Sequence, residues 1–247
     1  TFTHLREFFS VNMCFSRLVD NVLPVNDVSA CIESSPIFCE FVVACDTVLK
    51  GMERDTLLRT LAFGTNCLNR LWTGLTRTCD VSDRSYRRNI CVFAKIYHLY
   101  TMISDDEEFY RLKNPLNMQE TGQLVAMLRD VLWQLLWTER GPDGTCYQNL
   151  SAADEYADAE TWYACSTTLA HLHDRNGRQQ FTDPMEFHVL RDNIDIMSLL
   201  QEAKESKSRA STLLSAAPCL VPFEVRVHTF MDARKRDRQT SGVGYAG

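Results

Sequence analysis

The chain has 247 residues, 45% of them apolar, which is enough for one large or two small domains with a hydrophobic core. Its formal net charge of −6 and isoelectric point near 5.5 argue against a surface that binds nucleic acid or an anionic membrane. The sequence contains no run of about 18 uncharged apolar residues, so a membrane-spanning helix is not expected. Only 10 glycines and 7 prolines interrupt the chain, so long helices are favoured.

The amino-terminal third is patterned as helices. A first apolar stripe ends at Asn21 and Pro24 and consists of Leu5, Phe8, Val11, Phe15 and Leu18. Ser35-Pro36 has the form of an N-cap followed by the first helical position, so it predicts a helix that starts there and ends at Gly51. From Asp55 one long helix is expected, with an apolar face made of Leu57, Leu61, Leu68, Trp72 and Leu75.

Three further helices are expected in the middle of the chain. Ser82 or Asp83 is a candidate N-cap for an apolar repeat made of Ile90, Phe93, Ala94, Tyr97 and Tyr100. The acidic residues 105–108 favour the start of a short helix, because negative charge is stabilised at a helix N-terminus. Asn117 and Glu120 have the spacing of a capping box, which precedes the apolar positions Leu124, Leu128, Val131 and Leu135.

The carboxyl-terminal part begins with an expected linker over residues 141–160, which is rich in glycine, alanine and acidic residues. Helical patterning resumes at Trp162 and is expected to break at Asn176-Gly177. Asp183-Pro184 predicts the start of another helix, and a last pair is expected over residues 194–217 and 222–238.

This pattern predicts an all-α fold, because no alternating apolar run is bounded by turn residues as a strand would be. Antiparallel helices with short connections could form a solenoid of the HEAT or armadillo type. No repeat of fixed period is found, so we expect an irregular helical array. We divide it into a helical array over residues 1–140, a linker over 141–160, a second helical segment over 161–217 and a further domain that begins at 218.

The ten cysteines predict neither disulfides nor a zinc site. No two of them have the Cys-x-x-Cys spacing, and most lie within apolar helical patterns, where a free cysteine acts as a small buried hydrophobe. Reduced thiols are typical of a cytoplasmic or nuclear protein.

Three other patterns are weighed against a structural role. Cys165, His171, His173 and His188 lie near one another in sequence, but histidines two apart on a helix diverge, so we expect no metal site. The basic residues 234–238 favour the solvated end of a helix over a nucleic-acid patch. Residues 242–247 spell Gly-x-Gly-x-x-Gly without the flanking strand and helix of a dinucleotide site, so we expect no cofactor.

The order Pro222-Phe223-x-x-Arg226-Val227-x-x-Phe230, followed by basic residues, resembles the start of the catalytic domain of HECT-type ubiquitin ligases. The resemblance is sharpest over residues 213–238, and a looser one covers 109–137. It implies that residues 218–247 begin a truncated HECT domain and that the chain is the helical scaffold upstream of it. The partners it implies are a ubiquitin-conjugating enzyme and ubiquitin through the missing domain, with substrates or the proteasome on the helical region.

Thr145-Cys146-x-x-x-Leu150 also resembles the segment around the HECT catalytic cysteine. Leu-Pro does not follow it here, and the family's cysteine lies far downstream of the Pro-Phe motif, whereas Cys146 precedes that motif. We therefore interpret this match as chance and expect no catalytic residue in the chain.

Two functions stay open from the sequence. Either the parent protein is a HECT-type ubiquitin transferase and this chain is an inactive fragment of it, or the chain is a helical protein-interaction module unrelated to ubiquitin. The coding sequence after Gly247 distinguishes them, because only the first requires a catalytic cysteine further downstream.

Overall fold

The computed structural model describes residues 19–23, 28–49, 51–64, 66–78, 80–112, 115–137, 152–189, 214–227 and 231. Within these ranges the regular structure is entirely helical, which confirms the all-α prediction. None of the helices within them is long and apolar enough to cross a membrane.

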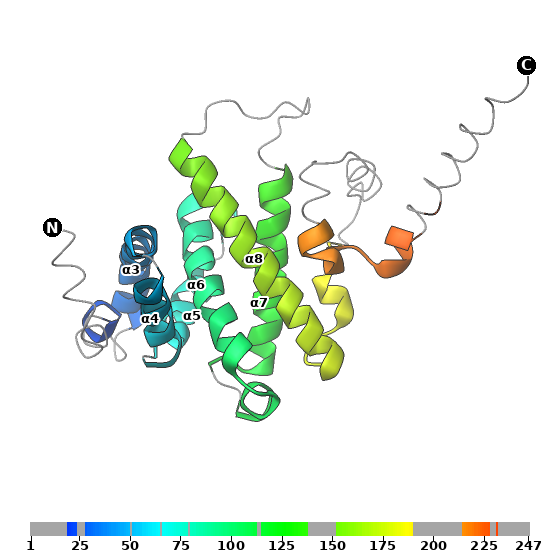
Figure 1. Ribbon diagram of the computed structural model, residues 1–247, viewed down its shortest axis with the longest axis horizontal. Coiled ribbons are helices and arrows are strands. Elements are labelled where there is room, and N and C mark those ends of the chain that lie inside the picture. The colour runs from blue at the N-terminus through cyan, green and yellow to red at the C-terminus, as the bar shows by residue number, and fades with distance from the viewer. Residues whose placement is uncertain are drawn as a thin grey trace, which may run out of the picture.

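Within the described residues the main α-helices of the array (Figure 1) are, in chain order, α3 (Val28–Val48), α4 (Met52–Arg59), α5 (Cys67–Thr78), α6 (Arg84–Ile103), α7 (Met118–Trp137) and α8 (Ala152–Arg178). Short π-helical turns, η1 (Thr60–Gly64) and η2 (Glu108–Leu112), lie between them. Two 3₁₀ helices follow α8, η3 (Pro184–Phe187) and η4 (Pro218–Leu220).

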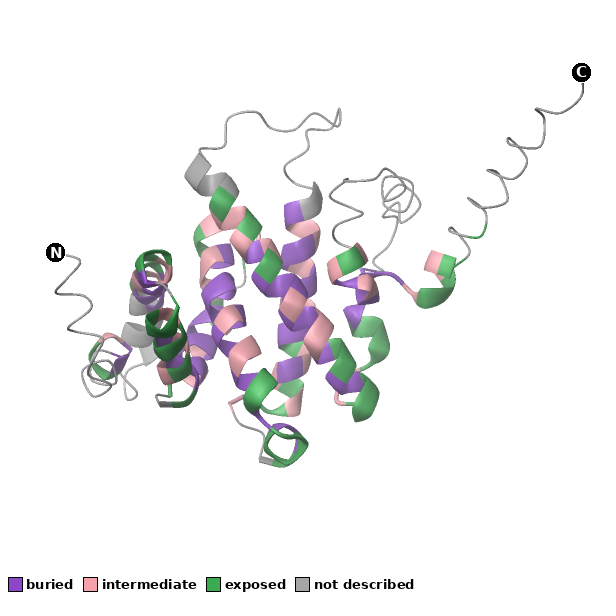
Figure 2. Cartoon of the chain, in the orientation of Figure 1, coloured by how far each residue is buried: buried purple, intermediate pink, exposed green. Residues whose placement is uncertain are grey.

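Helix α6 is the centre of the array. It contacts α3 and α5 on one side and α8 on the other, while α8 also packs against α7. In Figure 1, α8 crosses in front of α6 and α7, and α3 and α4 lie on the opposite side of α6 from α7. Buried residues gather where these helices meet, and α4 is mostly exposed (Figure 2).

Several local predictions are confirmed. Asp83 is the N-cap of α6, since its carboxylate accepts a hydrogen bond from the Ser85 N–H at 3.0 Å. At α7 the capping box is complete, because the Asn117 N–H donates to Glu120 at 2.8 Å and the Glu120 N–H donates to Asn117 at 2.9 Å. The expected apolar faces of α6 and α7 are buried.

The predicted helix start at Ser35-Pro36 is wrong. Helix α3 already begins at Val28, and Pro36 lies inside it. Proline removes one main-chain hydrogen bond from a helix interior, but packing of an apolar face offsets that loss. Phe38, Val42 and Cys45 are buried as expected, so the periodicity is correct and only the boundary fails.

The single long helix predicted from Asp55 is instead two helices. Helix α4 and its π-turn end at Gly64, and α5 begins at Cys67. The apolar positions Leu57 and Leu68 are both buried, because a short break changes the direction of the chain without removing either apolar face from the core.

Helix α8 is longer than expected at both ends. Residues 152–160 belong to its first turns, although they were assigned to a linker. At the other end the helix continues through Asn176 and Gly177 to Arg178. The Asn176 carboxamide oxygen accepts hydrogen bonds from the N–H groups of Phe181 and Thr182 instead, so it shapes the turn after the helix.

Asp183 and Pro184 begin a single 3₁₀ turn, where Asp183 is the N-cap, and not a longer helix. The stripe over residues 5–18, the linker residues 141–151, Cys146 and the basic and glycine-rich residues 234–247 lie outside the described residues.

Candidate functional site: the docked segment 214–227

The segment after η3 returns to the array and is buried in it. Ala217, Cys219, Leu220 and Val221 are at most 5% exposed, and η4 contacts α8. The Val189 N–H donates a hydrogen bond of 2.9 Å to the Leu220 carbonyl, which connects this segment to the residues that follow η3. Ala217 and the stretch from Cys219 to Val221 are therefore part of the core.

Local sequence explains the shape of this segment. Pro218 occupies the first turn of η4, where a missing N–H costs nothing. The turn is closed by the Leu220 N–H, which donates to the Ala217 carbonyl at 3.2 Å. Pro222 then ends the buried stretch, and the chain is helical again over 223–227.

The helix that starts at Phe223 is attached to this buried stretch by Arg226. Its Nε donates to the Val221 carbonyl at 3.0 Å, and its guanidinium lies 5.7 Å from the centre of the Phe223 ring. Val225 is half-buried and packs against the core. The inward side of the helix is thus Val225, while Phe223 faces outward.

Because Phe223 follows Pro222 at a helix start and repeats with Val227 and Phe230, the sequence predicts it to be a buried anchor, and this prediction is wrong. Its side chain is 66% exposed. The residues that fill the core are those of the preceding non-helical stretch, Cys219 to Val221, and they leave no space for the first helical residue. A continuous apolar stretch between two prolines was the signal that could have shown this.

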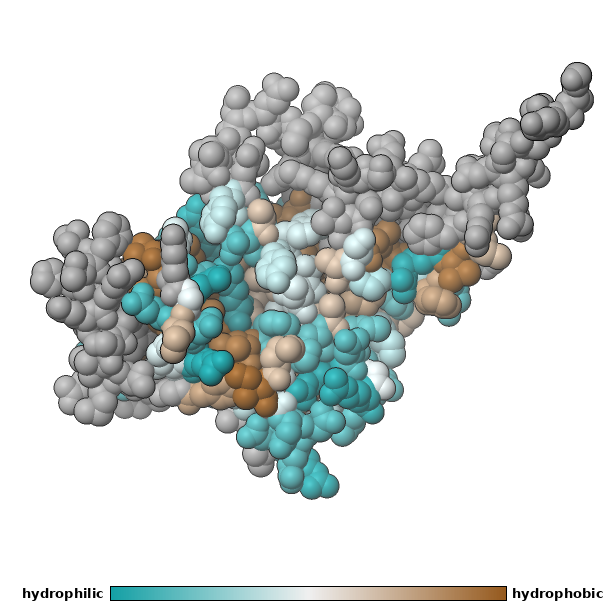
Figure 3. All heavy atoms as spheres, viewed as in Figure 1, coloured by the Kyte–Doolittle hydropathy of each residue, from teal (hydrophilic) through white to brown (hydrophobic). Residues whose placement is uncertain are grey.

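Phe223 and Val227 lie on one exposed apolar face, because residues four apart share a face of a helix. Val227 is 39% and Met231 54% exposed. Figure 3 shows hydrophobic spheres over the helical residues 223–227 at the right of the molecule. Exposed apolar groups at helical spacing are chemically suited to bind another protein surface.

The described cysteines are poor nucleophiles. Burial raises the pKa of the Cys219 thiol to about 12 and that of Cys91 to about 11, and it raises the pKa of Cys165 as well. A thiolate nucleophile needs the opposite shift and an exposed position. The free cysteines of the described residues are all buried, as expected from their apolar neighbours, and they are Cys39, Cys45, Cys67, Cys91, Cys165 and Cys219.

The histidines near Cys165 point to separate neighbours. The His171 ring stacks edge-on against His98 at 5.5 Å, whereas His173 stacks against Phe187 at 5.2 Å. Within the described residues no group of three or more histidine, cysteine or acidic side chains could hold a metal ion.

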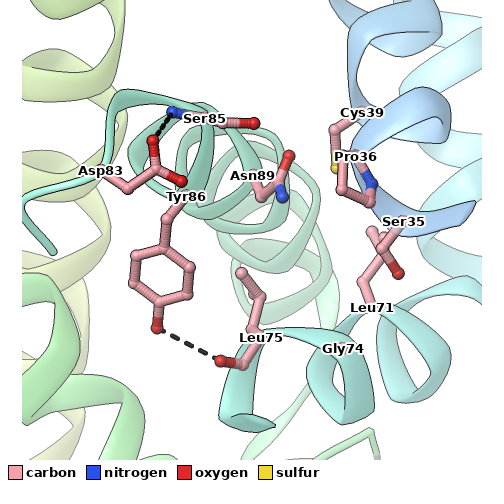
Figure 4. Close-up of a pocket in the computed structure, with 10 residues that line it drawn as sticks. All are labelled: Ser35, Pro36, Cys39, Leu71, Gly74, Leu75, Asp83, Ser85, Tyr86 and Asn89. Carbon is pink, nitrogen blue, oxygen red and sulfur yellow. Dashed lines mark hydrogen bonds between the residues drawn. The ribbon is translucent and has the colours of Figure 1, made fainter. Parts of the chain in front are cut away.

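A pocket lies between α3, α5 and the start of α6 (Figure 4). Its cavity volume is about 90 Å³, enough for a few water molecules. Its polar groups serve the fold, since Asp83 caps α6 and the Tyr86 hydroxyl donates to the Leu75 carbonyl at 3.3 Å. We assign no catalytic role to it.

The chain is similar to segments of two ubiquitin-protein ligases. E3 ubiquitin-protein ligase UPL6 of Arabidopsis thaliana is 33% identical to it over 159 residues, which are 62% of this chain and 15% of the ligase. Ubiquitin-protein ligase E3B of Homo sapiens is 26% identical over 149 residues, which are 59% of this chain and 12% of the ligase. The match thus spans less than a sixth of either relative.

No protein-family model matches the chain, and no solved structure matches it. The similarity to the two ligases therefore relates the chain to known proteins. The structure adds the arrangement of the helices in this chain.

Proposed function

We propose that this chain is the helical scaffold region of a HECT-type ubiquitin transferase. The observation that carries the proposal is the 33% identity to a ubiquitin-protein ligase over 62% of the chain. The order Pro222-Phe223-x-x-Arg226 supports it, because this motif begins a helix whose apolar stripe is exposed. Such a stripe suits a following domain of the same polypeptide.

In this proposal the chemistry belongs to a catalytic domain downstream of Phe223. Ubiquitin passes from a conjugating enzyme to a cysteine of that domain as a thioester, and then to a substrate lysine. The helical array binds substrates or other protein partners in the cytoplasm or nucleus. The chain Thr1–Gly247 by itself transfers no ubiquitin.

The test compares the full-length protein encoded by the same gene with the chain Thr1–Gly247. Each is incubated with charged ubiquitin-conjugating enzyme and separated with and without reductant. We expect a reductant-sensitive ubiquitin adduct on the full-length protein and none on the shorter chain. Failure of the full-length protein to form that adduct with a panel of conjugating enzymes contradicts the transferase proposal.

A matched variant tests the rejection of Cys146. If the shorter chain forms an adduct that Cys146→Ala abolishes, then Cys146 is a functional nucleophile and the division into scaffold and catalyst is wrong. The alternative, a helical interaction module unrelated to ubiquitin, is favoured if neither protein forms an adduct.

A further inference from the structure

The connection between the array and the helix at Phe223 contains no flexible residue. Glycine is absent from residues 214–227, and the two prolines, Pro218 and Pro222, have fixed φ angles. A segment meant to act as a mobile hinge is typically rich in glycine and serine and is exposed to solvent. In this one the central residues, Ala217 and Cys219 to Val221, are apolar and buried.

Two hydrogen bonds join the parts in series. The Val189 N–H donates to the Leu220 carbonyl and holds the buried stretch on the array. Arg226 Nε donates to the Val221 carbonyl and holds the helix on the buried stretch. Since both acceptors are main-chain carbonyls of adjacent residues, the helix cannot tilt without breaking one bond or moving the buried stretch.

Rotation of the helix about its own axis is opposed as well. Val225 packs against the core on the inward side, while Phe223 and Val227 stay exposed on the outward side. A rotation that brought Phe223 inward would expose Val225 and withdraw Arg226 from the Val221 carbonyl. Side-chain packing and hydrogen bonding thus set the same orientation.

We propose that residues 214–227 are a rigid coupling, which holds the helix beginning at Phe223 at one orientation relative to the helical array. Its consequence for activity rests on the proposed function: if a catalytic domain is attached to that helix, the coupling fixes the position of this domain relative to the array. Because positioning decides which groups can react, the coupling limits which lysines near the array the ubiquitin thioester reaches.

The physical test measures the orientation in the chain Thr1–Gly247. Two residues, Tyr163 on α8 and Val227, are each replaced by a keto amino acid that carries a spin label. Both are exposed in the structure. We expect one narrow distance distribution. Inserting Gly-Ser-Gly-Ser between Val221 and Pro222 leaves the buried stretch in place and adds roughly 11 Å of flexible reach, so the distribution should broaden by about that amount.

Two substitutions on the same helical turn serve as a matched pair. Arg226→Gln removes the hydrogen bond to Val221 and should broaden the distribution partly. Glu224→Gln changes an exposed neighbour, for which no hydrogen bond to a described residue is found, and should leave the distribution narrow. A wild-type distribution as broad as that of the insertion variant overturns the proposal, whatever the protein's activity.

The functional test uses the full-length protein and maps its self-modified lysines by mass spectrometry. We expect the insertion to leave thioester formation within about twofold and to change which lysines of the full-length protein are modified, because only positioning is altered. An unchanged lysine pattern with normal thioester formation overturns the coupling's role. Absence of the thioester in the wild-type protein refutes the proposed function instead, and the distance measurement still decides the coupling.

Discussion

At the scale of single residues, buried arginines act as caps for helices other than their own. The Arg175 side chain is 4% exposed and donates to the carbonyls of Thr101 and Ser104 at the end of α6, at 2.5 and 2.6 Å. The last carbonyls of a helix have no partner within it, and the guanidinium has five donors to offer. Arg70 similarly donates to the Leu23 carbonyl, and also to the Val19 carbonyl, which already accepts the Leu23 N–H.

Replacement of Arg175 by methionine should destabilise the array strongly. The variant keeps an apolar side chain of similar length but leaves the Ser104 carbonyl without its side-chain donor, which costs about 1–3 kcal/mol for a buried group, and the Thr101 carbonyl keeps only His171 Nε2 at 3.3 Å and the Ser104 hydroxyl at 3.4 Å. Thermal and denaturant unfolding measure the change. Arg178→Met is the matched control, since Arg178 pairs with the same Asp106 as Arg175 but is 57% exposed, and its loss should stay within about 0.5 kcal/mol. Equal losses in both variants contradict the capping role.

A pair of glycine substitutions tests the packing of α3 on α5. A Cβ added at Gly74 meets Ser35 Oγ at 2.7 Å, whereas one added at Gly177 has no atom within 4 Å. Overpacking costs about 1–3 kcal/mol and exceeds the gain of about 0.5–1 kcal/mol from replacing a helical glycine by alanine. We expect Gly74→Ala to lower the unfolding temperature and Gly177→Ala to raise it. A stabilised Gly74→Ala variant excludes the close contact.

At the scale of helices, the interface between α6 and α8 contains a pair of histidines. His98 and His171 are stacked edge-on, and His171 Nε2 lies 3.3 Å from the Thr101 carbonyl. Burial lowers the pKa of both rings, and each is lowered further by a neighbouring cation or histidine: His98 by His171, and His171 by Arg175 and Arg178. The Thr101 carbonyl and Asp174 raise the pKa of His171, but burial outweighs them.

This interface should weaken in mild acid. The folded pKa values lie below the ordinary value of about 6.5, so the unfolded chain takes up protons first as the pH falls. The contribution is fully present above about pH 6.5 and is lost as the pH falls through the folded pKa values. We expect His98→Phe to unfold with a shallower dependence on pH between about 7 and 5, measured by denaturant titration. An unchanged slope in His98→Phe excludes this pair as the cause.

At the scale of the whole molecule, the described helices form one array to which segment 214–227 also belongs. Helix α8 packs against α6 and α7, so residues on both sides of the expected linker share a core. One charged contact also joins the two sides, because Lys95 of α6 binds Glu160 of α8 at 2.5 Å, and the same ammonium group binds Asp46 of α3 at 2.8 Å. Whether residues from 218 onward begin a separate domain stays a prediction.

The sequence by itself determined the helical fold, the apolar faces of α6 and α7 and the capping box at Asn117, and it narrowed the cap of α6 to Ser82 or Asp83. These follow from local rules: the 3.6-residue period and side chains that bind main-chain groups a few residues away. The helix boundaries predicted at Pro36 and Gly177 are wrong, since both residues lie inside helices. Tertiary packing there outweighs the local cost of a proline or glycine.

Only the tertiary structure decided which residues of the Pro-Phe segment are buried. Phe223 and Leu220 are both large and apolar, and the sequence favoured the aromatic ring as the anchor. The array has space for the stretch from Cys219 to Val221, and the hydrogen bond between Val189 and Leu220 selects that register. Such contacts join residues more than thirty positions apart. A local pattern carries no information about them, because burial depends on what the rest of the chain places opposite each side chain.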